Sequence, residues 1–212
     1  MAHLLRKELQ LTKLYILFFI LLIPFTYGMN VQITGITIWI MIGFMIMMFY
    51  SDSLNEVYRY IVSVPIKRDQ IVCTRYIFLL ILSGGFSLYL WLIDYVAHIG
   101  LPFLEKESLS GINIFSLFTL ISIIFSASIP LFYYIKSFHR AMTVYMVLVI
   151  IVAFFTAIIT FNPLITFDNA IIHFVHSIIE IQPFIILGSF SMLCLFVSYK
   201  FSAWIFIRRD II

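Results

Sequence analysis

Charged residues are scarce in this chain of 212 residues: Asp, Glu, Lys and Arg make up 11% of it, and 63% is hydrophobic. Soluble domains carry about 25% charged and 45–50% apolar residues. The scarcity of charge therefore excludes a soluble globular protein and predicts an integral membrane protein. So little polar chain remains that we expect one transmembrane domain over residues 1–212, with no separate soluble domain.

Several chemical motifs are also missing. The two cysteines, Cys73 and Cys194, form neither a disulfide framework nor a zinc-site pattern. No G-x-x-x-x-G-K-[ST] motif occurs, so we expect no ATP bound by this chain. No zinc-protease motif or catalytic-triad spacing is present, and we expect no catalytic residues, metal or nucleic-acid partner. Residues Leu82–Gly85 read L-S-G-G and lie within an apolar run. Small residues in such a run indicate helix packing or a kink.

Six apolar runs are each near the ~20 residues that cross a bilayer. They cover approximately Leu14–Met29, Ile33–Tyr50, Tyr76–His98, Ile114–Ile135, Ala141–Phe161 and Phe184–Ile207. Each should be helical, because backbone groups in lipid need partners within the segment. The first run is short and should continue towards the N-terminus through residues 1–13. Pro24 and Pro130 fall inside spans and predict kinks. The fold class expected is an all-α membrane protein.

Positive charge is distributed unequally between the two sides of these spans. Twelve of the 13 Lys and Arg residues fall on one side, and Lys106 alone falls on the other. The positive-inside rule then places both termini in the cytoplasm. The starting segment Met1–Lys13 lacks a signal-peptide cleavage site, and we expect it to be retained.

The long connection 162–183 falls on the outer side. Within it His173, His176, Ser177 and Glu180 share one face at helical spacing, which predicts an amphipathic or re-entrant outer helix. The two histidines and the glutamate could ligate a metal, but a polar face towards water explains the same residues, and we favour that explanation.

The cytoplasmic stretch Ser51–Tyr76 contains seven charged residues between two apolar runs. Ser53 and Glu56 match a capping box at a helix start. Apolar residues then recur at helical spacing, and Pro65 ends the pattern. Asp69 could cap the next helix. The stretch therefore predicts a short amphipathic helix at the inner surface, over about Leu54–Val64, followed by a basic corner. From the residues alone, this helix could bind anionic lipid heads or dock a cytoplasmic partner.

One motif favours docking. Ser63, Val64, Pro65, Arg68, Gln70, Ile71, Val72, Arg75 and Tyr76 form a pattern that resembles the cytoplasmic segment of ABC-2 type transporter permeases. The opening residues Leu4–Lys13 and the six-span layout are also similar to that family. Val64 stands where the family more often has leucine.

The resemblance implies that the chain is a multi-pass permease subunit of an ATP-driven exporter in the cell membrane. The membrane expected is a bacterial plasma membrane. A separate cytoplasmic ABC ATPase subunit would hold ATP and Mg, and the permease would pair as a homodimer or a heterodimer. The predicted amphipathic helix over about Leu54–Val64 would contact the ATPase, and we call it the coupling helix. The residues expected there are Leu54, Glu56, Val57, Arg59, Tyr60, Ile61, Pro65 and Arg68.

The substrate would be an amphipathic peptide, a drug or a lipid-like molecule. Asp94, with His98 one turn further on, is the acidic residue placed well inside a span. It is a candidate for lining the transport path; pairing with His98 or contact with water is the simpler explanation. Three alternatives remain: a scaffold or sensor that recruits a cytoplasmic protein, an ATP-independent channel, and an integral-membrane enzyme.

Overall fold

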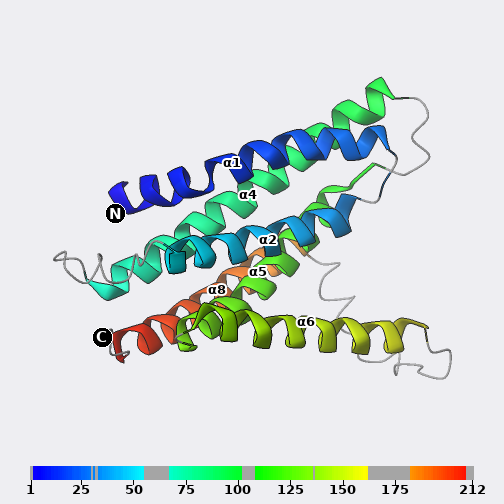
Figure 1. The fold of residues 1–212 in the computed structure, drawn as a ribbon. Helices are drawn as coiled ribbons and strands as arrows, with labels where there is room; N and C mark the ends of the chain where they lie inside the picture. Colours follow the sequence, from blue (N-terminus) through cyan, green and yellow to red (C-terminus); the bar gives the residue numbers. More distant parts are fainter. Residues whose placement is uncertain are drawn as a thin grey trace.

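The computed structural model describes residues 2–29, 31, 33–54, 67–101, 108–135, 137–161 and 182–208. These residues form six helices and no strand (Figure 1). The helices are α1 (Ala2–Gly28), α2 (Ile33–Leu54), α4 (Arg68–Gly100), α5 (Gly111–Tyr134), α6 (Phe138–Phe161) and α8 (Pro183–Arg208). The expected all-α class is confirmed for this part of the chain.

Each of these helices is long and apolar enough to cross a membrane, so the chain is a multi-pass membrane protein. Each of the six predicted apolar runs falls in one of these helices; the runs ending at Met29 and Ile135 pass the end of their helix by one residue. Helix α1 begins at Ala2, which confirms that the first span continues towards the N-terminus. Helix α4 has 33 residues and is about 50 Å long, more than the ~30 Å of a bilayer core, so its ends extend beyond it.

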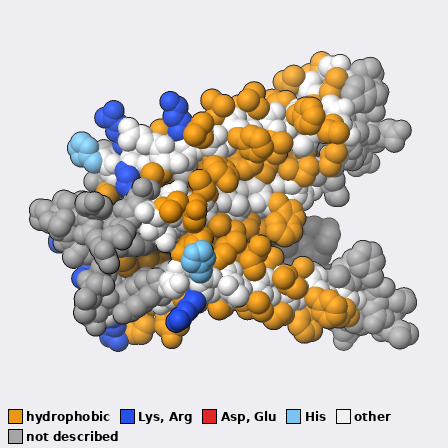
Figure 2. All heavy atoms as spheres, viewed as in Figure 1, with side chains coloured by type: hydrophobic (Ala, Val, Ile, Leu, Met, Phe, Trp, Pro, Cys, Tyr) orange, Lys and Arg blue, Asp and Glu red, His pale blue; other side chains and the backbone are white. Residues whose placement is uncertain are grey.

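Both termini lie at one end of the helix bundle, on the left of Figure 1, together with the end of α2 and the start of α4. We call this the basic end. The described Lys and Arg residues lie in or next to the helix halves nearest to it, and Figure 2 shows them gathered towards that side. They are Arg6, Lys7, Lys13, Lys67, Arg68, Arg75, Arg140, Lys200 and Arg208.

The buried core lies among α2, α4 and α5, with α1 and α8 packed around them. Phe44, Met45, Leu79 and Ile129 are at most 1% exposed. Helices α5 and α8 form the most extensive helix pair. Helix α6 packs through its first turns, where Ala141 and Tyr145 are buried; most large hydrophobic side chains further along it are exposed. That exposure suits a lipid environment.

Two prolines lie inside helices, and each leaves one backbone carbonyl without its helical N–H partner. Pro24 leaves the carbonyl of Ile20, which accepts a 2.7 Å hydrogen bond from the Tyr89 hydroxyl of α4. Pro130 leaves the carbonyl of Ser126, which accepts a 2.7 Å hydrogen bond from Ser198 of α8. A hydroxyl on a neighbouring helix therefore satisfies each orphaned carbonyl and joins two helices at each proline.

Two sequence expectations near the basic end are wrong. Helix α2 runs through Ser53 and Leu54, so Ser53 does not cap a separate helix. Lys67, not Asp69, is the N-cap of α4. Asp69 lies in the first turn, where its negative charge suits the helix dipole, and its carboxylate accepts a hydrogen bond from Tyr199 at 2.6 Å.

The L-S-G-G stretch lies inside the continuous helix α4. A Cβ atom added to Gly84 or Gly85 would meet open space among the described atoms. Among the described residues, no helix therefore approaches these two glycines closely, although Leu82 and Ser83 of the same stretch are buried.

Candidate coupling site and ion cluster

The coupling helix was predicted for the connection between α2 and α4, whose two ends lie at the basic end. Leu54 is the last residue of α2, and its side chain is 63% exposed. Arg68 begins α4 and donates a 3.2 Å hydrogen bond to the Ile207 carbonyl of α8. The other predicted contact residues lie outside the described residues: Glu56, Val57, Arg59, Tyr60, Ile61 and Pro65. The structure thus describes the last turn of α2 and the first two turns of α4, which flank the connection and which we call its stems.

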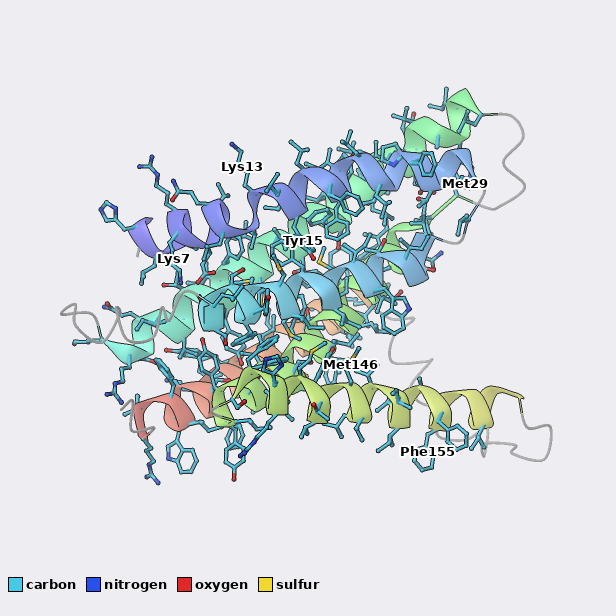
Figure 3. All side chains as sticks on the ribbon, in the orientation of Figure 1. Lys7, Lys13, Tyr15, Met29, Met146 and Phe155 are labelled. Atoms are coloured by element: carbon cyan, nitrogen blue, oxygen red, sulfur yellow. The ribbon has the colours of Figure 1, made fainter. Side chains whose placement is uncertain are left out.

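Four charged side chains lie between these stems and α1: Lys7, Glu8, Asp52 and Arg75, which we call the ion cluster. The Arg75 guanidinium contacts a carboxylate oxygen of Asp52 and lies 3.2 Å from Glu8 Oε1. Lys7 Nζ lies 3.1 Å from Asp52 and 3.5 Å from Glu8. Figure 3 shows Lys7 pointing from α1 towards α2 and α4. The cluster therefore joins three helices next to the connection.

The ion cluster is largely removed from water. The side chains of Arg75 and Asp52 are 1% exposed and that of Glu8 is 6% exposed, whereas Lys7 is 27% exposed. Arg75 also lies over the Phe49 ring, 4.6 Å from its centroid. Buried charges must keep their partners, because an isolated charge in a low-dielectric interior is costly. The stems at Asp52 and Arg75 are thereby held together and held to α1.

A second set of contacts joins the α4 stem to α8. The Tyr76 hydroxyl lies 2.6 Å from Ser198 Oγ and 2.8 Å from Ser202 Oγ. The Tyr199 hydroxyl donates to Asp69. A displacement of the first turns of α4 would therefore pull on α8 through hydrogen bonds and on α1 and α2 through the ion cluster.

Asp94 lies near the opposite end, in α4, and is 3% exposed. Its carboxylate accepts a 2.7 Å hydrogen bond from the Tyr27 hydroxyl and a 2.8 Å hydrogen bond from the Leu109 backbone N–H. His98 Nδ1 lies 3.6 Å from Asp94 Oδ1 and 2.8 Å from the Asp94 carbonyl oxygen. Asp94 and His98 are thus adjacent, and Asp94 ties α1, α4 and the residues before α5 together.

No group of three His, Cys, Asp or Glu side chains that could hold a metal occurs in the part of the chain that the structure describes. The predicted outer helix, with His173, His176 and Glu180, lies outside that part.

The described part of the chain has six helices able to cross a membrane and a cluster of buried charges at the end where basic residues gather. These features define a multi-pass membrane protein. The family model of the ABC-2 family transporter proteins matches residues 3–207. The chain therefore belongs to the ABC-2 transporter family, as its motif suggests. No match was found among curated proteins or among solved structures. Members of this family are typically non-catalytic membrane subunits, and the family in general implies an ABC ATPase partner.

Proposed function

We propose that this chain is the permease subunit of an ATP-driven exporter and that the connection between α2 and α4 couples it to a separate ABC ATPase. The family match over residues 3–207 supports the permease role. The positive-inside rule supports a cytoplasmic location for the basic end, where an ATPase would have access to the connection. The membrane would be a bacterial plasma membrane.

The observation that carries the coupling role is the ion cluster at the stems of this connection. Asp52 lies two residues before the end of α2, and Arg75 lies seven residues after the start of α4. The contact between them makes the two stems move together, and Glu8 brings α1 into the same unit. A force applied to residues 55–66 by a closing ATPase would therefore act on three spans at once.

In this mechanism the chain performs no bond chemistry. ATP and Mg bind on the ATPase subunits, and two permease copies, identical or related, enclose the transport path. The long apolar helices and the scarcity of charge suit an amphipathic peptide, a drug or a lipid-like substrate. The free energy of ATP binding to the ATPase subunits would be converted to helix movement through the stems.

Co-purification tests the proposal. The tagged chain, purified from its own cells in mild detergent, should bring down an ABC ATPase. Reversing both charges with Glu56→Lys and Arg59→Glu should reduce the recovered ATPase while leaving the chain folded. A matched control reverses Glu105→Lys and Lys106→Glu in the outer connection and should leave recovery unchanged. Undiminished recovery with the Glu56 and Arg59 reversals would refute the coupling assignment.

Two other functions predict different results. A scaffold or sensor would recruit a cytoplasmic protein that lacks an ATP-binding motif. A channel would move solute down its gradient when the purified chain alone is placed in vesicles without ATP. Either result would replace the exporter proposal.

A further inference from the structure

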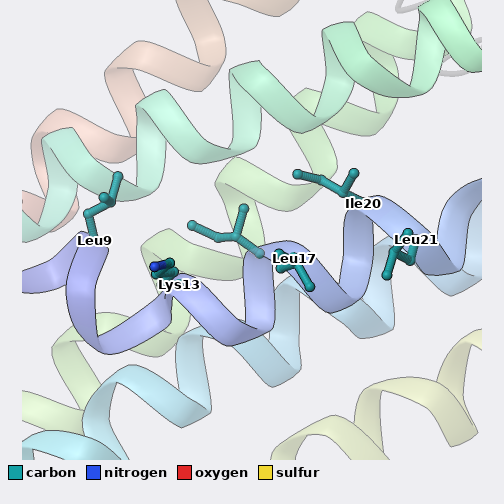
Figure 4. Close-up of a pocket in the computed structure, with 6 residues that line it drawn as sticks. Leu9, Lys13, Leu17, Ile20 and Leu21 are labelled. Atoms are coloured by element: carbon teal, nitrogen blue, oxygen red, sulfur yellow. The ribbon is translucent and has the colours of Figure 1, made fainter.

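An apolar groove follows the outer surface of α1 and the seam between α1 and α4. A hollow of about 430 Å³ is lined by Leu9, Lys13, Ile16, Leu17, Ile20 and Leu21 (Figure 4). A second hollow, of about 260 Å³, shares Ile16 and Ile20 and continues to the α4 residues Ile81, Leu82, Gly85, Phe86 and Tyr89. The two hollows together form the α1–α4 groove.

The floor of this groove is lined mostly by hydrocarbon side chains. The Tyr89 hydroxyl, one of its few polar groups, donates to the Ile20 carbonyl. Gly85 has no side chain, and the space where its Cβ would lie is open. From Lys13 to Leu21 the groove follows eight residues of α1, about 12 Å at the helical rise per residue. This length and surface fit part of an acyl chain lying parallel to the helix.

The mouth of the groove is basic. Lys13 lines the hollow, and Arg6 lies seven residues earlier, on the same face of α1. Both side chains are exposed, and no described carboxylate forms an ion pair with either of them. In Figure 3 Lys13 points away from the helix bundle, whereas Lys7 points into it. The apolar run of α1 begins at Leu14, so Lys13 lies where the hydrocarbon of a bilayer would begin.

We propose that the α1–α4 groove binds a phospholipid with an anionic headgroup. The headgroup phosphate pairs with Lys13 and Arg6, and one acyl chain occupies the groove as far as Leu21. Charge complementarity selects the headgroup, since a zwitterionic lipid gains less from two cations than a lipid with net negative charge. The site uses residues away from the connection between α2 and α4, and the proposal does not depend on the exporter function.

Fluorescence quenching in reconstituted bilayers tests this proposal. Trp39, Trp91 and Trp204 are replaced by phenylalanine in the full chain, and Leu21→Trp then reports from the far end of the groove. Brominated phosphatidylglycerol or brominated phosphatidylcholine is added at the same mole fraction to otherwise identical phosphatidylcholine bilayers. Phosphatidylglycerol should quench more strongly at low mole fraction. Its relative affinity should fall about fivefold with Lys13→Gln and about 25-fold when Arg6→Gln is added.

Two further variants make the result specific. Arg140→Gln combined with Lys200→Gln removes two exposed charges at the basic end, on α6 and α8, and should leave the preference for phosphatidylglycerol unchanged. Gly85→Leu fills the groove floor without changing any charge and should weaken quenching by phosphatidylglycerol. Equal quenching by the two lipids, or a preference that survives loss of Arg6 and Lys13, would overturn the proposal. Absence of quenching by either lipid would overturn it too, because a protein surface such as a second copy would then cover the groove.

Discussion

Replacing Arg75 by methionine should destabilise the fold more than any other single change in the ion cluster. The side chain is 1% exposed and contacts both Glu8 and Asp52, so its loss leaves two buried carboxylates with Lys7 as their remaining described cation. Breaking a buried ion pair by removing one partner typically costs about 3–5 kcal/mol. Lys7 is 27% exposed, and solvent screening limits the cost of Lys7→Met to about 1 kcal/mol.

The free energy of unfolding can be measured for each variant by titrating SDS into mixed micelles and following helicity by circular dichroism. Adding Asp52→Asn to Arg75→Met should recover part of the loss, because Lys7 then faces one buried carboxylate instead of two. The interaction energy in the double-mutant cycle should be about 1–3 kcal/mol. If Arg75→Met costs no more than Lys7→Met, the cluster does not hold the stems together and the reasoning fails.

Three further predictions concern other parts of the fold. Tyr89→Phe should lower the unfolding free energy by about 1 kcal/mol in the natural chain. In a chain with Pro24→Ala the Ile20 carbonyl regains an N–H partner, so Tyr89→Phe should then cost close to nothing. Equal costs in both backgrounds would contradict this. Asp94→Ala should cost about 3 kcal/mol in the same SDS titration, since two hydrogen bonds to a buried carboxylate are lost; a cost below that of Tyr27→Phe would argue against this role. A single cysteine at Ser177, with both native cysteines replaced, should react with an impermeant maleimide from outside the cell, and labelling from the cytoplasm alone would overturn the topology.

The number and approximate positions of the spans were predictable from hydrophobicity because each run had to be a helix in lipid. The helix ends were not. The polar stretch Ser51–Tyr76 looked like a separate segment, yet α2 extends to Leu54 and α4 begins at Arg68. The charges that interrupt the apolar pattern do not end these helices, because Asp52 and Arg75 neutralise each other across the helix pair.

The ion cluster was missed, although the sequence contains a signal for it. In α4, Arg75 continues the helical stripe of the buried residues Val72 and Leu79, and in α2, Asp52 follows Met45 and Met48 at the same kind of spacing. A charge that continues a buried stripe indicates a buried ion pair. Which charges pair with one another depends on how the helices pack, and periodicity along a single helix does not determine that.

For the hydrogen bonds at the two prolines, the acceptor was predictable from the sequence and the donor was not. Each proline identifies the carbonyl that it leaves free, four residues earlier, and this follows from helix geometry alone. The donors, Tyr89 and Ser198, come from helices that are distant in sequence, and only the three-dimensional arrangement identifies them.

Site-specific crosslinking tests the central claim, coupling to an ABC ATPase through the connection between α2 and α4, most directly. A photoreactive amino acid placed at Tyr60 in intact cells should form a crosslink to a protein that contains a phosphate-binding G-x-x-x-x-G-K-[ST] loop. The same amino acid at Ser177, in the outer connection, should form none. Crosslinks from Tyr60 to lipid alone, or to a protein without that loop, would contradict the account.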